Sequence, residues 1–286
     1  MMGAIASFLG MIIRFIYSLV GNNYFVSIIL FTILTKVILF PLYWIQIKST
    51  EKMNRIGPLD QKIREKYKND KQKQAEELTK LYSENKINPL GGCLPLLIQI
   101  PLILAMFMIV KQPLTYIVRT PQEDIKAYTQ EYLQKEDVSD KEMKEYEIPI
   151  AKEKNLLNMQ VFKGFNLGDI PANVFSKDEA KKASPLSLAI PILTIVFSVL
   201  SNRLMMKNSN MTDEQKQMQK SMNIMMPLLS ASISYSMPLA LGIYWLFGSI
   251  LQIFQQYLTN WIIKKDKEKL ALSEGGVKKW KKLQNK

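Results

Sequence analysis

The stretch YFVSIILFTILTKVILFPLYWIQI, residues 24–47, carries a single charged side chain, that of Lys36. At about 1.5 Å per residue, an α-helix of this length crosses the roughly 30 Å hydrocarbon core of a bilayer. A soluble domain would place charged residues every few positions. The stretch therefore predicts a transmembrane helix with a cation near its middle.

Four further stretches have the same apolar character. They are residues 91–112, 185–206, 221–236 and 237–263. The chain is 48% hydrophobic yet carries 38 Lys and Arg against 25 Asp and Glu, so apolar and charged residues are segregated into blocks. Such blocks are typical of membrane helices joined by aqueous loops. We expect an all-α polytopic membrane protein with five transmembrane helices. The span 221–236 is short, which local bilayer thinning or a tilted neighbour would explain.

The N-terminal residues 1–23 are apolar but make a poor signal peptide, because they lack a basic start and carry Arg14 late. They form either a helix that lies on the outer surface of the membrane or an additional span. The connection Gly21-Asn22-Asn23 is short for a hairpin between two spans. An N-terminal interfacial helix is therefore the favoured interpretation.

Residues 48–90 are rich in charge and predict two amphipathic helices. Apolar residues recur at helical spacing in two sets, Ile56, Leu59, Ile63 and Tyr67, then Leu78, Leu81 and Tyr82. The polar turn Lys68-Asn69-Asp70 separates the two sets, which indicates a helical hairpin. Its apolar stripe either packs on itself or docks on the bilayer or a partner.

The distribution of charge predicts the orientation in the membrane. Residues 48–86 hold eleven Lys and Arg against seven acids, and the segment after Ile263 holds nine Lys against three acids. Residues 113–184 instead hold eleven basic residues and thirteen acids. Because basic loops stay in the cytoplasm, we place the hairpin, the 207–220 loop and the 264–286 tail inside and the 113–184 loop outside. The basic tail would anchor this orientation, or contact anionic lipids or ribosomal RNA.

The composition excludes several classes of chemistry. The sequence has no histidine and a single cysteine, Cys93, which rules out Ser-His-Asp and Cys-His catalysis, histidine-based metal sites and a disulfide within the chain. Glycine-rich phosphate-binding motifs are also missing from the sequence. We therefore expect neither an enzymatic activity nor a bound cofactor.

Lys36 needs an explanation, because a lysine in the middle of a membrane helix costs about 2.5 to 3.5 kcal/mol on insertion scales. The five spans contain no Asp or Glu, which leaves water as its partner and disfavours a proton- or sodium-coupled transporter. Thr32, Lys36 and Tyr43 share one helical face, so this face could line a wet cavity. Other spans would add the polar residues Gln99, Asn202, Asn223 and Gln252. The alternative is a lysine that snorkels to the headgroups.

Four motifs around these residues are informative by their order and spacing. They are TILTKVILFPL in the first span, NPLGGCLPLLIQIPL at 88–102, MQKSMNIMMPLL at 218–229 and MPLALGIYWLFGSILQIFQQ at 237–256. Together they resemble the YidC family of membrane protein insertases, which includes the mitochondrial Oxa and chloroplast Albino types. The resemblance covers residues 24–262. It is to the form found in monoderm bacteria, because no large domain precedes the core.

The resemblance implies a five-transmembrane-helix insertase core, with a cytoplasmic helical hairpin, around a hydrophilic groove that is open to the cytoplasm and to lipid. Lys36 stands where the family carries a positive charge in the groove, most often an arginine. Ser201-Asn202 stand where the family often has glutamines, and Tyr244-Trp245 match an LYW-type motif with Trp245 against the groove. The expected groove residues are Lys36, Thr32, Tyr43, Gln99, Ser201, Asn202, Tyr244 and Trp245.

The function implied by the resemblance is insertion and folding of small membrane proteins in the bacterial cell membrane, without nucleotide hydrolysis. The expected partners are nascent membrane proteins, the Sec translocon, the ribosome through the C-terminal tail, and anionic lipids. Two alternatives remain open. One is a solute channel or transporter with a polar cavity, and the other is a passive scaffold for assembly.

Overall fold

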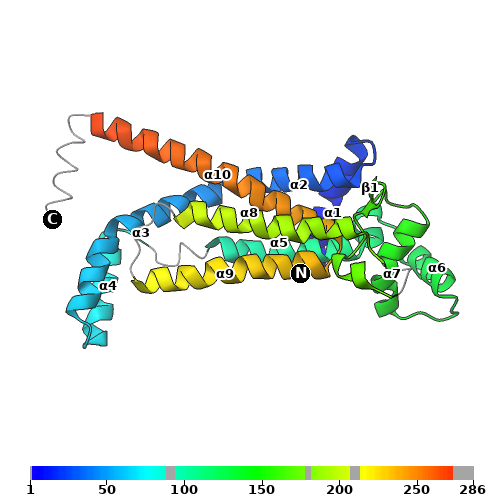
Figure 1. Cartoon of the computed structure of the whole chain (residues 1–286), viewed down its shortest axis with the longest axis horizontal. Coiled ribbons are helices and arrows are strands. Elements are labelled where there is room, and N and C mark those ends of the chain that lie inside the picture. The colour runs from blue at the N-terminus through cyan, green and yellow to red at the C-terminus, as the bar shows by residue number, and fades with distance from the viewer. Residues whose placement is uncertain (1, 88–93, 178–181, 207–212, 273–286) are drawn as a thin grey trace.

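The computed structural model describes residues 2–87, 94–177, 182–206 and 213–272. Only the backbone is described for residues 94–98, 205–206, 213–220, 222–223 and 266–272. The regular structure in these ranges is helical apart from one short two-stranded hairpin, as predicted for an all-α polytopic membrane protein. Figure 1 shows an elongated molecule in which long helices run side by side, with the charged helix pair at one end and a smaller region, residues 114–177, at the other.

The first predicted span consists of two helices, α2 (Tyr24–Ile38) and α3 (Phe40–Lys66), which meet at an angle of 53°. Pro41 explains the break. Within a continuous helix a proline removes a backbone hydrogen bond and clashes with the carbonyl four residues earlier. In the first turn of a new helix, where Pro41 now lies, neither penalty applies. The predicted span 24–47 therefore contains a bend at Leu39, and no helix ends at the predicted boundary between residues 47 and 48.

The predicted hairpin consists of the second half of α3 and α4 (Lys71–Glu84). Asp70 begins α4 by accepting a hydrogen bond from the Lys73 backbone N–H at 3.0 Å, as expected of an N-cap residue. Ile56 and Leu78 of the predicted stripe are buried. The hairpin therefore buries part of its own apolar stripe, while Leu59 stays 41% exposed.

The remaining long helices are α5 (Leu94–Lys111), α8 (Ala189–Met206), α9 (Asp213–Ser236) and α10 (Leu239–Leu272). α10 packs against both α8 and α2, and α8 also packs against α9. Among the described residues, Met2–Leu19, Pro185–Leu204 and Leu239–Lys265 are long and apolar enough to cross a membrane, and the bent pair α2–α3 is a fourth such unit. The qualifying apolar parts of α5 and α9, Gln99–Lys111 and Ile224–Ser236, are shorter.

Two helices extend beyond the predicted spans. α9 begins at Asp213, inside the predicted loop 207–220, and α10 continues to Leu272, inside the predicted basic tail. Lys, Glu and Leu are good helix formers, so the charged sequence after Ile263 continues the helix without an apolar environment. The Gly91-Gly92 boundary and the tail after residue 272 lie outside the described residues.

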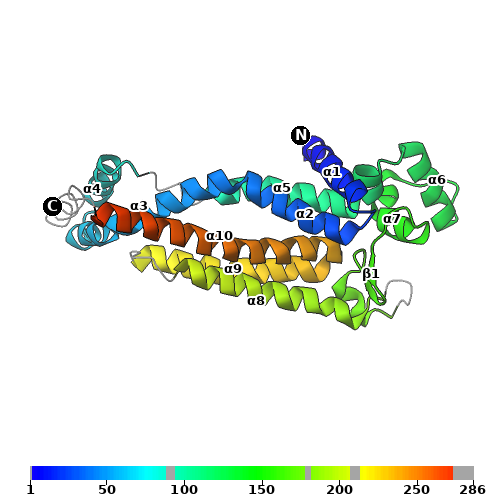
Figure 2. The same ribbon diagram turned by 90° about the horizontal axis from the view of Figure 1, so that it is seen from above.

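α1 (Met2–Leu19) lies at a steep angle to α2 and α5 in both views (Figures 1 and 2). It packs on α5, α2 and the turn that follows α5. Gly10 allows this approach, because a Cβ atom there would overlap the Tyr116 carbonyl. One face is buried, including Ala6 and Ile13, and Phe15 on the other face is 64% exposed. Whether this helix lies on the membrane stays a prediction.

The predicted outer loop 113–184 contains more structure than its charged sequence suggested. Its elements are the π-helix η2 (Leu114–Val118), α6 (Gln122–Leu133), α7 (Asp140–Glu153), strands β1 (Gln160–Phe162) and β2 (Phe165–Asn166), and the 3-10 helix η3 (Pro171–Phe175). A further 3-10 helix, η4 (Pro185–Leu188), opens the predicted span 185–206. A capping box starts α7, because Ser139 and Glu142 bond to each other's backbone N–H groups. α6 and α7 pack on each other.

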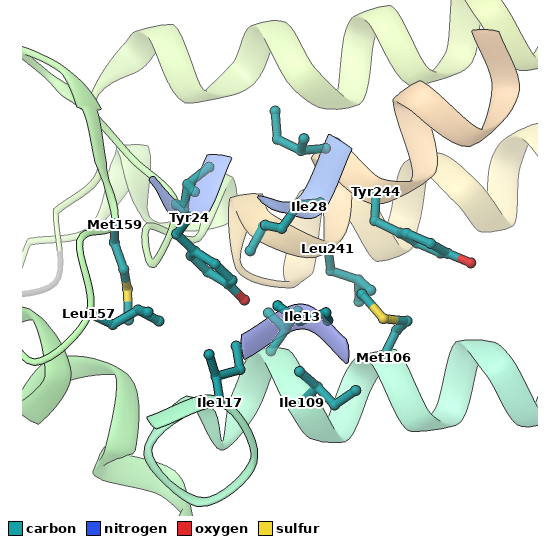
Figure 3. Packing of buried hydrophobic residues seen from close by; sticks show 14 of the residues in the cluster. Ile13, Tyr24, Ile28, Met106, Ile109, Ile117, Leu157, Met159, Leu241 and Tyr244 are labelled. Atoms are coloured by element: carbon teal, nitrogen blue, oxygen red, sulfur yellow. The ribbon is translucent and has the colours of Figure 1, made fainter. Parts of the chain in front are cut away.

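The hydrophobic core lies where the region of residues 114–177 meets the ends of the long helices. Figure 3 shows Ile13 of α1, Ile28 of α2, Ile109 of α5 and Leu241 of α10 converging there, together with Leu157 from that region. All five side chains are at most 2% exposed. The region of residues 114–177 therefore shares one core with the predicted spans and does not form a core of its own.

Candidate functional site

A pocket lies beside the bend of the first span. Its walls come from α2, α3, α5 and α10: Thr35, Lys36, Leu39, Leu42, Tyr43, Gln46, Gln99, Leu102, Tyr244 and Gln255. The space between these side chains is about 590 Å³, which includes space open to solvent. The pocket combines one cation, three amides and three hydroxyl groups with three leucines.

Lys36 lies in the last turn of α2, three residues before the bend at Leu39, and its side chain is half-buried. Gly248 on α10 faces the lysine stem, since a Cβ atom added there would lie 3.9 Å from Lys36 Cε. None of the ion pairs among the described residues includes Lys36. Its charge is therefore free to interact with a group that enters the pocket.

Two glutamines of α10 hold the bent helices. The Gln255 Nε2 atom donates to the Lys36 carbonyl oxygen at 3.2 Å. The Tyr43 hydroxyl donates to Gln256 Oε1 at 2.7 Å, and Gln256 Nε2 donates in turn to Asn260 Oδ1 at 3.0 Å. α10 thus contacts the last turn of α2 through one glutamine and the first turn of α3 through the other. These bonds tie both sides of the bend to one rigid helix.

Tyr244 forms another wall of the pocket. Its ring is buried against Phe31 of α2, with ring centroids 6.4 Å apart. Its hydroxyl makes a hydrogen bond with the Gln99 side chain of α5. The tyrosine therefore bridges α2, α5 and α10 and brings a polar group next to Lys36.

Four of the eight predicted groove residues line this pocket, namely Lys36, Tyr43, Gln99 and Tyr244. The other four do not. Thr32 is buried and its hydroxyl donates to the Ile28 carbonyl at 2.6 Å. Trp245 follows Tyr244 on α10 and points elsewhere, because successive residues of a helix lie about a quarter turn or more apart.

Ser201 and Asn202 belong to α8, which packs on α10 but contributes no residue to the pocket. Ser201 is buried, and its hydroxyl has no partner among the described residues. Asn202 is half-buried. The other polar residues considered from the sequence do not add to the pocket either, since Gln252 is not in its lining and the Asn223 side chain lies outside the described residues.

The sequence contained a signal for some residues that the prediction missed. Lys36, Leu39, Tyr43 and Gln46 recur at intervals of three and four residues, which is the spacing of one helical face across the bend. Gln255 had no comparable signal, because a glutamine in an apolar helix can face any neighbouring helix.

The pocket has the polar and apolar groups of a binding site. A lysine surrounded by hydroxyl and amide groups attracts carboxylates and polar peptide groups. Among the described residues, no group of three or more His, Cys, Asp or Glu side chains could hold a metal ion. The leucines give the same pocket an apolar side on which a hydrophobic segment can lie.

Comparison with known proteins places this arrangement in a wider group. The sequence profile described as 60Kd inner membrane protein matches residues 15–267. The "Membrane protein insertase YidC" of Caldanaerobacter subterraneus subsp. tengcongensis is 32% identical over 90% of this chain and 94% of its own length. The protein of that name from Oceanobacillus iheyensis is 30% identical over 84% of this chain and 75% of its own length. The one from Chlamydia trachomatis serovar D is 30% identical over 90% of this chain, which spans 28% of that longer relative.

Proposed function

The chain belongs to the 60Kd inner membrane protein family, and on this premise we propose that it is a membrane protein insertase and chaperone. Its substrates would be small nascent membrane proteins. The single observation that carries the proposal is the pocket at the bend, where the unpaired cation Lys36 lies among amides, hydroxyls and leucines at the level of a membrane span. An acidic or polar substrate segment would enter beside the lysine, and the apolar segment that follows would lie against the leucines.

The energy for this process would come from the substrate and the membrane. Burying a substrate's apolar helix in lipid is favourable by about 25 cal/mol per Å² of apolar surface. The membrane potential adds about 2.3 kcal/mol per charge for each 100 mV. Lys36 would lower the cost of taking a polar segment part of the way across the hydrocarbon, so that no nucleotide is needed.

The apolar surface beside the pocket supports release of the substrate into lipid. Leu42 of the pocket wall is 37% exposed, and Ile38 and Ile45 on the same bent helix pair are 61% and 57% exposed. A hydrophobic helix bound against Leu42 could therefore move sideways without crossing a polar barrier. The solute channel or transporter is the less favoured alternative, because a pocket with an open apolar side does not enclose a small solute.

The proposed orientation in the bacterial cell membrane has the hairpin and the C-terminus in the cytoplasm. We place α6, α7 and the β-hairpin outside and α1 at the outer interface, in line with its steep angle to the bundle. In this orientation the hairpin and the basic tail would face nascent chains, the ribosome and anionic lipids, and the Sec translocon would dock laterally. We assign no enzymatic activity to the chain.

Reconstitution tests the proposal directly. Purified protein in liposomes should insert a short single-span substrate with an acidic outer tail, as measured by protease protection of the tail. We expect Lys36→Ala to reduce insertion and Lys36→Arg to restore it, because arginine keeps the charge at this position. Lys48→Ala, which removes an exposed lysine twelve residues further along the same bent pair, is the matched control.

Two outcomes would contradict the proposal. Equal insertion by wild type, Lys36→Ala and Lys36→Arg would show that the charge has no role. A flux of small solutes that persists in Lys36→Ala, without any insertion by the wild type, would favour the channel or transporter.

A further inference from the structure

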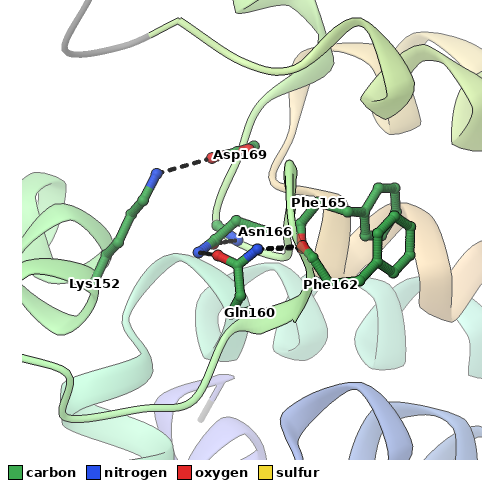
Figure 4. Close-up of polar contacts among 7 residues, drawn as sticks. Lys152, Gln160, Phe162, Phe165, Asn166 and Asp169 are labelled. Atoms are coloured by element: carbon green, nitrogen blue, oxygen red, sulfur yellow. Dashed lines mark hydrogen bonds and ion pairs between the residues drawn. The ribbon is translucent and has the colours of Figure 1, made fainter.

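The turn between β1 and β2 presents two aromatic rings and a lysine, in the order Phe162-Lys163-Gly164-Phe165. Gly164 has a φ of 81°, a left-handed conformation that favours glycine and closes the turn. The rings of Phe162 and Phe165 are stacked, with centroids 5.1 Å apart and planes 12° apart. Figure 4 shows both rings pointing to the same side of the hairpin, away from the polar groups of Gln160 and Asn166.

The backbone around this turn is held in place. The Gln160 side chain donates to the Phe162 carbonyl and also to the Phe165 carbonyl, the latter at 3.4 Å. Gln160 and Asn166 pair across the two strands. The aromatic rings therefore project from a defined hairpin and not from an extended loop.

Contacts connect the β-hairpin to the beginnings of two candidate spans. A Cβ atom on Gly164 would lie 3.6 Å from the Ser184 hydroxyl, and the apolar stretch Pro185–Leu204 begins at the next residue. In the first turn of α10, the Leu239 N–H donates to the Asp169 backbone carbonyl at 2.8 Å, and the Ala240 N–H donates to the Leu167 backbone carbonyl at 2.9 Å. The segment that follows β2 is thus bonded to the start of a second candidate span.

The turn exposes one of its two rings, and exposed apolar side chains follow it in the chain on η4 and α8. Phe162 is 52% exposed although Phe165 beneath it is only 6% exposed, and Leu186 in η4 is 46% exposed. On α8, Ile192 is 59% and Val196 is 54% exposed. Aromatic side chains are enriched where a membrane meets water, and exposed lysines at that level reach lipid phosphates. Lys163, at the tip of the turn, is exposed.

We propose that the Phe162-Lys163-Gly164-Phe165 turn is a lipid anchor, in which the Phe162 ring enters the bilayer interface and the Lys163 ammonium contacts phospholipid headgroups. The occupant of this surface is the phospholipid leaflet next to the outer ends of α8 and α10. The anchor would fix the height of the region of residues 114–177 on the membrane. The inference does not depend on insertase activity; only the assignment of the leaflet as the outer one rests on the proposed orientation.

Site-directed spin labelling of the full chain in phospholipid vesicles tests this anchor. Cys93→Ser provides a background without cysteine, and a nitroxide is then placed through Phe162→Cys or Lys163→Cys. Val196→Cys on the exposed face of α8 is the lipid reference, and Lys126→Cys on the exposed face of α6 is the water reference. The measurement is the ratio of accessibility to oxygen, which concentrates in lipid, over accessibility to a water-soluble nickel complex.

We expect the ratio at position 162 to exceed that at position 126 several-fold and to approach that at position 196, with position 163 between the two. A ratio at 162 equal to that at 126 would overturn the proposal. If the spin-labelled protein does not fold, the variant Phe162→Trp, made in the otherwise unchanged chain, is used for a fluorescence measurement. Its fluorescence should be quenched by lipids brominated near the headgroup more than that of the wild type, and equal quenching would also overturn the anchor. Substrate insertion is assayed in the same vesicles, so that a failure of the lipid anchor is distinguished from a failure of the proposed insertase function.

Discussion

Lys36 is positioned through its backbone as well as through its side chain. Its carbonyl lies in the last turn of α2, where the break at Leu39 removes the usual intrahelical partners. Gln255 supplies a replacement donor from α10 at 3.2 Å. The direction of the lysine side chain therefore depends on a residue that carries no charge.

Replacing Gln255 by leucine should show this dependence. Gln255→Leu keeps a similar volume but leaves the Lys36 carbonyl without its donor, which should lower the free energy of unfolding by about 1 kcal/mol, the usual net worth of a hydrogen bond. Insertion should fall as well, although Lys36 itself is intact. Thermal unfolding in detergent and the liposome insertion assay measure the two effects.

Tyr257→Phe is the matched control for Gln255→Leu. Tyr257 lies two residues further along α10 and is 60% exposed, so the loss of its hydroxyl should change neither stability nor insertion. If Gln255→Leu behaves like this control in both assays, the bond to Lys36 does not position the lysine.

The sequence predicted the residues of the pocket that are unusual in a membrane helix. Lys36 is the one charge in its span, and Tyr43 follows on the same face, so both could be found by hydropathy and periodicity. Thr32 shares that face but its hydroxyl bonds back to Ile28, an option open to any helical threonine. Tyr244 could be predicted from the family motif that contains it. The role of Gln255 could be found only from the packing of α10 on α2 in the structure.

Among the secondary structure elements, α7 is joined to η2, which follows α5, by a buried carboxyl group. Glu147 is 1% exposed and accepts hydrogen bonds from the Thr115 N–H at 2.9 Å and the Thr115 hydroxyl at 2.6 Å. Burial raises the pKa of Glu147 from 4.5 to about 7, against the opposing effects of these hydrogen bonds and of nearby Lys144. Tyr116 of η2 also faces this carboxyl group.

This raised pKa predicts a pH dependence with a definite sign. The folded protein binds the Glu147 proton more tightly than the unfolded chain, so protonation favours folding. The contribution should be fully present below about pH 4.5 and be lost as the pH rises through about 7. Each pKa unit corresponds to about 1.4 kcal/mol. The stability difference between wild type and Glu147→Gln should therefore shift in favour of the variant between pH 5 and pH 8, as measured by thermal unfolding.

Glu145→Gln provides the control on the same helix, because Glu145 is exposed. Its stability difference from the wild type should not follow the profile of Glu147→Gln. A Glu147→Gln difference that is constant from pH 5 to pH 8 would show that the buried carboxyl does not titrate in this range.

The helix pair of α3 and α4 is joined by a second buried acid. Asp60 of α3 is fully buried and makes hydrogen bonds with Arg64 and with the Tyr82 hydroxyl of α4. Burial and the neighbouring Asp60 carboxylate raise the pKa of Tyr82 to about 12, so the hydroxyl stays a donor at physiological pH. This bond links the two helices of the hairpin across their interface.

Tyr82→Phe should loosen the hairpin without unfolding the membrane helices. A hydrogen bond to a charged group contributes about 1.5 to 3 kcal/mol, so backbone amides of α4 should exchange with deuterium faster while those of α8 and α10 do not change. Tyr67→Phe is the control, because Tyr67 contacts Lys66 and Lys73 through its ring, which phenylalanine retains. Equal exchange in both variants would contradict a role of the Tyr82 hydroxyl.

The sequence predicted these elements unevenly. Hydropathy located the long helices, and Lys68-Asn69-Asp70 marked the turn of the hairpin because Asp70 caps α4. The bend at Leu39 was less visible, since Pro41 is compatible with either a kinked or a broken helix. Residues 113–184 showed little apolar periodicity because part of their burial is against α1 and α5, which no local pattern reveals.

The whole molecule has two chemically different ends. In Figure 1 the basic hairpin and the C-terminal end of α10 lie at one end, and α6 and α7, with their surplus of acids, lie at the other. Basic segments that are far apart in the sequence therefore lie at the same end of the molecule, as the rule that basic loops stay in the cytoplasm requires. The elongated bundle between the two ends therefore supports one orientation in the membrane.

Cysteine accessibility in intact cells tests this orientation. In the Cys93→Ser background, Lys126→Cys on α6 and Lys71→Cys at the start of α4 both place a thiol at an exposed position. Basic segments stay inside, which leaves the acidic segment with α6 outside. A membrane-impermeant maleimide should therefore label position 126 in intact cells. Position 71 should be labelled only after the membrane is permeabilised. The reverse pattern would overturn the proposed topology, because the pocket at Lys36 would then be on the wrong side for a chain arriving from the cytoplasm. Labelling of both positions in intact cells would mean that the chain lacks a single orientation.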